Sequence, residues 1–189
     1  GIVDKFMPEN DLWQEDSLDF ASNVTQDMFN NIIDIGLEIY KPTADQWNET
    51  LVINKLWSDS TVNADAWRDG QGATNINMYG GMARRQEVVP IGFALVMCHE
   101  ISHLYGGKPY VQASVKIAAE GQSDYMGAGW CLKQIAEKLD DPSAIDITTY
   151  MKDVCGNDDT CLRQLAGGNS LGVLLAKLSG EKTPNFETP

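Results

Sequence analysis

The chain contains only two histidines, His99 and His103, and they stand four residues apart with Glu100 directly after the first. This HExxH pattern favours a helix, because a helical turn brings residues i and i+4 to the same face. Two imidazoles on one face can bind a single zinc ion, and the carboxylate beside them can act on the water bound there. The pattern therefore predicts one helix and a zinc site on it.

The residues around the pattern are typical of the two ends of a helix. Pro90 suits the first turn, and Gly106-Gly107 followed by Pro109 ends the helical pattern. We therefore expect a helix over residues 91–105, with both histidines on one face about one turn apart.

A third ligand must be a carboxylate or a cysteine, because no further histidine exists. Glu120 and Asp124 stand four residues apart on a second helix, which we expect to run from about 112 to 139 and to return antiparallel to the first. In that arrangement Glu120 binds the zinc ion, one per chain, while Asp124 accepts the remaining N–H of a ligating histidine.

Glu100 is expected to be the catalytic base. Zinc lowers the pKa of its bound water, and a nearby carboxylate can take that proton and pass it to a leaving amine. The complete set of residues predicts a zinc-dependent endopeptidase.

The remaining chain indicates an α+β fold in one domain of 189 residues. We expect a small, mostly antiparallel sheet packed on the two metal-binding helices, with further helices at both ends. Residues 1–10 and 181–189 are expected to be loose tails. The expected strands lie near 51–53, 61–67 and 73–79, and the other expected helices over 17–40, 147–154 and 161–178.

Composition limits the partners of the chain. A net charge of −13 argues against nucleic acid or an anionic membrane surface, since phosphates attract cationic proteins. No apolar run approaches the roughly 20 residues needed to span a bilayer, so we expect no membrane insertion. The oligomeric state stays open.

Four cysteines allow three pairings. Cys155 and Cys161 bracket a polar, turn-forming loop that a disulfide could close, which leaves Cys98 and Cys131 as a second pair or as buried thiols. This pairing favours an oxidising location, either periplasmic or extracellular. The alternative is four reduced cysteines in a cytoplasmic protein.

The metal motifs carry a family resemblance. His99-Glu100-x-x-His103 followed by Glu120-x-x-x-Asp124 resembles the gluzincin clan of zinc metallopeptidases. Asn63-Ala64-Asp65-Ala66, the strand that ends at Tyr79, and Gly80-Gly81 resemble the soluble relatives of the HtpX-type, CAAX-endopeptidase-like family. The similarity covers roughly residues 60–135.

The resemblance implies a zincin-like fold and a peptide or unfolded protein as substrate. It also implies that the strand 73–79 is an edge strand that pairs with an extended substrate, with contacts from Asn75, Asn77, Tyr79 and Gly80.

The chain departs from the family in having no downstream histidine to stabilise the oxyanion, so a tyrosine or arginine must replace it. Tyr150 and Arg163 are the candidates. The departure leaves an alternative open: a catalytically inactive, gluzincin-like metal-binding module with a protein-binding, peptide-binding or assembly role.

Overall fold

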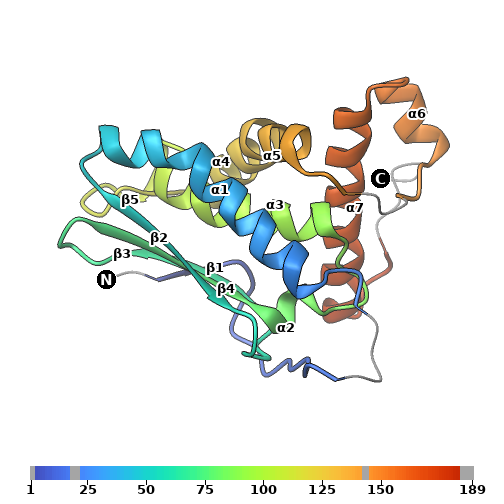
Figure 1. Ribbon diagram of the computed structural model, residues 1–189, viewed down its shortest axis with the longest axis horizontal. Coiled ribbons are helices and arrows are strands. Elements are labelled where there is room, and N and C mark those ends of the chain that lie inside the picture. The colour runs from blue at the N-terminus through green and yellow to red at the C-terminus, as the bar shows by residue number, and fades with distance from the viewer. Residues whose placement is uncertain (1–2, 18–21, 142–144, 184–189) are drawn as a thin grey trace.

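The computed structural model describes residues 3–17, 22–141 and 145–183, and it shows an α+β fold with a small mixed sheet (Figure 1). Two helices, α1 (Gln26–Gln46) and α3 (Pro90–Tyr105), cover one face of that sheet. Among the described helices, none combines the length and the apolar character that crossing a membrane requires.

Helix α3 is the centre of the molecule. Every residue of it except Leu95 is buried, so the helix is enclosed on all sides rather than along one stripe. It is packed against α1, the sheet, α5 (Leu132–Lys138) and α7 (Asp159–Ser179). The predicted helix over 91–105 is confirmed, and it begins at Pro90.

The four-stranded sheet has the order β1-β3-β4-β2. Its strands are β1 (Asp4–Lys5), β2 (Thr50–Leu56), β3 (Ala64–Arg68) and β4 (Ala73–Tyr79). Strand β4 pairs antiparallel with β3 and parallel with β2, so the sheet is mixed, with two of its three strand pairings antiparallel. The prediction that 73–79 is an edge strand is wrong, because neighbours on both sides take up its backbone groups.

The two faces of β4 differ sharply in burial. Thr74, Ile76 and Met78 are fully buried against the helices, and the Thr74 hydroxyl lies 2.7 Å from the Tyr105 hydroxyl of α3. Side chains alternate along a strand, so Asn75 and Asn77 point to the opposite face.

Helix α1 starts later and ends later than its sequence pattern predicts. Thr25 caps it by accepting a hydrogen bond from the Met28 amide, and the predicted start at residue 17 adjoins residues 18–21, outside the described part. Pro42 does not end the helix, which continues to Gln46. Burial of Ala44 and the Lys41–Asp45 ion pair at 2.8 Å support this last turn.

The segment between α3 and the second metal-binding helix is a short hairpin. Strands β5 (Tyr110–Gln112) and β6 (Ile117–Ala118) pair antiparallel, and the next helix, α4 (Glu120–Met126), begins only at Glu120. The predicted helical start near 112 is therefore wrong. Tyr110, Val111 and Ile117 are aromatic or β-branched residues, which suit paired strands.

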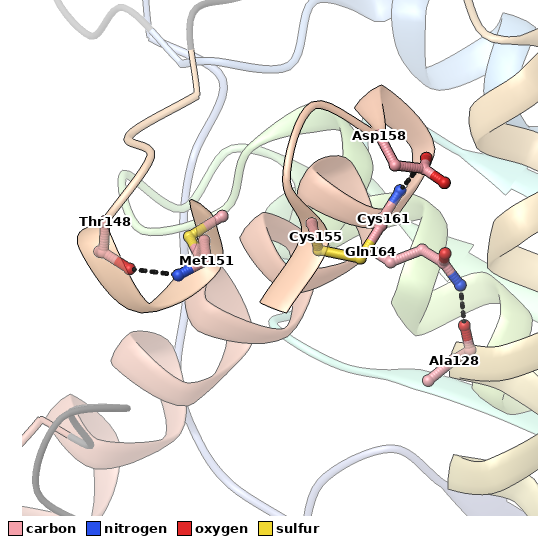
Figure 2. Close-up of a disulfide and its surroundings, with 7 residues drawn as sticks. All are labelled: Ala128, Thr148, Met151, Cys155, Asp158, Cys161 and Gln164. Atoms are coloured by element: carbon pink, nitrogen blue, oxygen red, sulfur yellow. Dashed lines mark hydrogen bonds between the residues drawn. A yellow bond between two sulfur atoms is a disulfide. The ribbon is translucent and has the colours of Figure 1, made fainter. Parts of the chain in front are cut away.

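Helix α4 (Glu120–Met126) continues through a π-helix, η1 (Gly127–Cys131), into α5. The widened π-turn contains Ala128, whose carbonyl accepts a hydrogen bond of 2.8 Å from the Gln164 side chain of α7 (Figure 2). Helix α7 is thus held to the continuous helical segment α4–η1–α5, which begins with Glu120.

The C-terminal helices agree with prediction, since α6 spans Thr149–Cys155 and α7 spans Asp159–Ser179. The Cys155–Cys161 disulfide closes the loop between them, and Asp158 caps α7 through the Cys161 amide at 3.0 Å (Figure 2). Residues 181–183 belong to no helix or strand, and the rest of the predicted tail lies outside the described residues.

The N-terminal tail prediction is wrong for the described residues, because β1 joins the sheet there. Further along, Arg84 holds this segment through its buried guanidinium, which donates to the carbonyl of Gln14 at 3.0 and 3.1 Å and also to that of Trp57. Arg84 follows the short helix α2 (Gly80–Ala83). Sequence reasoning gave it no role.

Both favoured disulfides are confirmed, with Cα–Cα distances of 5.6 Å for Cys98–Cys131 and 5.5 Å for Cys155–Cys161. They enclose very different lengths of chain, since the paired cysteines are 33 and 6 residues apart. A longer closed loop removes more entropy from the unfolded chain.

Replacing both Cys98 and Cys131 by alanine is therefore expected to lower the free energy of unfolding by about 4 kcal/mol, against about 2 kcal/mol for the Cys155 and Cys161 pair. Urea unfolding of the two double variants and the wild type measures both losses. Equal losses, or a larger loss for the shorter loop, would contradict the expectation.

Candidate metal centre

The two histidines and Glu120 converge at one point. The Nε2 atoms of His99 and His103 lie 2.9 Å apart, and the Glu120 carboxylate lies 3.2 Å from the first and 3.6 Å from the second. Ligand atoms of all three residues lie within 4.8 Å of one another. This group could hold one metal ion.

Each imidazole is oriented by an acceptor behind it. His99 Nδ1 lies 2.8 Å from the Asp124 carboxylate, and His103 Nδ1 lies 2.9 Å from the Ala118 carbonyl. Both partners can only accept, so each Nδ1 carries the proton and donates it. Each Nε2 then presents a lone pair to the shared point, as in most metal-binding histidines.

Electrostatics favours neutral imidazoles at this point. Burial lowers the pKa of His99, and a positive charge on His103 would lower it further, while Asp124 acts in the opposite direction. Partial burial raises the pKa of Glu120, which the nearby His103 opposes. Protons therefore compete with a metal ion mainly at acid pH.

Glu100 is the most unusual side chain of the site. It is fully buried, and within the described part of the chain neither carboxylate oxygen has a hydrogen-bond partner. Burial raises its pKa well above the usual range, and the negative charges of Asp4, Asp65 and Glu120 raise it further. A buried carboxylate without a partner is costly. Glu100 directly follows His99 in α3, and the charges that raise its pKa include that of Glu120.

Close packing sets the distance between α3 and the helical segment α4–η1–α5, which carries Glu120. A side chain at Gly127 would contact the backbone of Cys98 and His99 at 3.1–3.2 Å, and the Cys98–Cys131 disulfide joins the same two elements. Gly121 and Gly129 show no comparable approach. Of the three glycines in this segment, Gly127 is therefore the one that the helix contact requires.

The residues predicted to contact substrate lie elsewhere. Asn77 and Tyr79 form a hydrogen-bonded cluster with Asp65, at 3.0 and 2.7 Å, on the face of the sheet opposite α3, and Asn75 shares that face. Gly80 is buried against the Trp57 carbonyl, where only a hydrogen fits. These positions stabilise the sheet and its turn.

The two oxyanion candidates also lie outside this cluster. Arg163 donates to the carbonyls of Leu139 at 2.9 Å and Asp141 at 3.2 Å and pairs with Asp159, so it joins α5 to α7. Tyr150 belongs to α6, which packs on α7 and lies on the far side of α7 from α4 (Figure 1).

Two N-terminal residues reach the site that sequence reasoning did not associate with it. The Asp4 carboxylate lies 3.2 Å from His103 Nδ1, and the Phe6 ring packs edge-on against His99 with centroids 5.4 Å apart. No local sequence pattern predicts that Asp4 and Phe6 lie at the site, because their position depends on pairing with β3, some 60 residues away.

Comparisons of the chain with protein-family models, with curated proteins and with solved structures found no match. The assignment of this centre therefore rests on its own geometry.

Metal analysis of the purified chain is expected to give about one divalent ion per chain, lost in Glu120→Ala. Asp124→Asn should bind metal about 10–100-fold more weakly, because it loses the charged acceptor that orients His99. Glu137→Ala is a matched control, since that exposed helix carboxylate pairs with Lys133. Unchanged metal content in Glu120→Ala would refute the ligand assignment.

Glu100 also predicts a pH dependence of stability. Its pKa in the folded state lies above the unfolded value of about 4.3, so the folded chain binds the proton more tightly and loses stability as pH rises past that value. In chelator-treated protein, Glu100→Gln should be about 1–3 kcal/mol more stable than wild type at pH 7. The gain should vanish below about pH 4. Thermal unfolding across pH measures it, and a pH-independent difference would contradict this origin.

Proposed function

We propose that the protein is a zinc-dependent endopeptidase with a zincin-like arrangement of α3 and α4 beside the sheet. One observation carries the proposal: Glu100, a fully buried carboxylate with no hydrogen-bond partner among the described residues, directly follows one of three side chains that converge on a single point. A purely structural metal site has no need of such a carboxylate.

The donor set favours zinc. Two imidazole nitrogens and one carboxylate are a known ligand set of catalytic zinc, which keeps its fourth position for water or substrate. His99, His103 and Glu120 would hold the ion. Because the Glu120 side chain is 60% exposed, solvent can reach the ion from the side of Glu120.

Zinc, when bound, supplies a Lewis acid that polarises a peptide carbonyl and lowers the pKa of water. Glu100 then takes the proton of the attacking water and delivers it to the leaving amine nitrogen. Its raised pKa suits the first half of this transfer, because a carboxylate of higher pKa is the stronger base. Asp124 and the Ala118 carbonyl keep the imidazoles oriented throughout.

We propose a peptide or an unfolded protein segment as substrate, rather than nucleic acid or a membrane, because the chain carries a net charge of −13. Both disulfides favour an oxidising location, periplasmic or extracellular.

Hydrolysis of a fluorogenic peptide library by the zinc-loaded chain tests the proposal. Glu100→Gln is expected to keep its zinc and to lose at least about 100-fold in kcat/KM. Glu137→Gln, on the exposed face of α5, should match wild type.

Zinc-loaded wild type that cleaves no library member would overturn the enzyme proposal. Metal binding without turnover would instead favour the alternative, an inactive metal-binding module with a binding or assembly role.

A further inference from the structure

The edge of the sheet beside the metal centre is taken by the chain's own N-terminal segment. Residues 4 and 5 of β1 pair antiparallel with Ala66 and Asp65 of β3, and the Phe6 amide donates to the Ala64 carbonyl at 2.9 Å. All of these are backbone contacts, so they require an extended chain and no particular side chain.

Asn63 extends this backbone recognition by one residue. Its side-chain oxygen accepts from the Met7 amide at 3.0 Å, and its side-chain nitrogen donates to the Met7 carbonyl at 3.1 Å. The buried Asn63 amide thus binds both backbone groups of one residue, as a neighbouring strand would. Together, Asn63 and β3 form a built site for an extended polypeptide.

The bound segment lies directly against the metal-binding side chains. Phe6 packs on the ring of His99, and the Asp4 carboxylate contacts His103. A polypeptide that followed the same edge would pass the same point. The edge therefore leads an extended chain to the metal centre, and residues 4–7 occupy that path.

The hold on these residues is local and limited. Strand β1 is two residues long and lies at an edge of the sheet. A cavity of about 700 Å³ borders this part of the chain at Met7, Leu12 and Leu175. Beyond it, Arg84 anchors the Gln14 carbonyl. Residues 4–7 can leave while the chain near residue 14 stays in place.

We infer that residues 4–7 are a displaceable strand that occupies the path of an extended polypeptide to the metal centre, and that such a polypeptide gains access by replacing them on β3. The buried position of Met7 favours an apolar residue at the matching place of the incoming chain. The inference rests on the proposed function in treating that polypeptide as the substrate.

Peptide binding by the full chain tests the inference. The probe is a fluorescein-labelled, end-blocked peptide with the sequence of residues 3–8, followed by anisotropy, with its integrity checked by mass. In wild type the tethered segment competes at an effective concentration of about 1 mM. Phe6→Pro removes the N–H that donates to the Ala64 carbonyl and the ring that packs on His99. The tethered segment then competes less well, so this variant should bind the peptide at least tenfold more tightly than wild type does.

Asp11→Pro is the matched control, because this exposed residue lies in the same segment but outside the pairing. It should bind like wild type. Equal affinity for wild type and Phe6→Pro, or equal tightening in both proline variants, would overturn the inference.

Hydrogen exchange in the unmodified chain gives a second, independent measurement. The amides of Phe6 and Met7 should exchange through an opening that leaves the β3–β4 ladder protected. Exchange of these two amides only on global unfolding would overturn the inference even if Phe6→Pro failed to fold.

The two proposals fail differently. Tighter peptide binding by Phe6→Pro, together with no cleavage of any library member by the zinc-loaded wild type, would keep the displaceable strand and remove the endopeptidase. Cleavage by zinc-loaded wild type without tighter binding by Phe6→Pro would do the reverse.

Discussion

The complete enclosure of α3 is the constraint on which the other features depend. A helix that is buried on every side must be covered by several partners, and here α1, the sheet, α5 and α7 supply them. The same helix carries two histidines and a glutamate, so these polar groups enter the core with it. On the side that α4 and β1 cover, Glu120 and Asp4 lie beside the two histidines.

Polar groups in such a core need partners, and in the described structure the Glu100 carboxylate and the Ser102 hydroxyl of α3 are buried without one. The imidazoles have Asp124 and the Ala118 carbonyl, whereas Glu100 has none in the described structure. Natural proteins tolerate a local cost of this kind mainly where chemistry requires it. A carboxylate costs more to bury without a partner than a hydroxyl does, so Glu100 gives the proposed function its sharpest physical argument.

Local spacing predicted the centre, and long-range pairing escaped prediction. The i, i+4 relations of His99 with His103 and of Glu120 with Asp124 depend only on helix geometry, so they could be inferred from the sequence. The place of β4 inside the sheet could not, because an alternating strand reads the same at an edge as in the middle. The role of residues 4–7 depends on Asn63 and β3, which no pattern within four residues can reveal.

The Cys98–Cys131 disulfide has a consequence for how the protein matures. Cys98 directly precedes His99 in α3, and Cys131 lies in η1, which continues the helix that carries Glu120. Until this bond forms, the element that carries the third ligand is held against α3 by noncovalent packing alone, closest at Gly127. We therefore expect oxidation of the Cys98 and Cys131 thiols to precede metal uptake. The metal centre would then assemble only in chains in which this disulfide has formed.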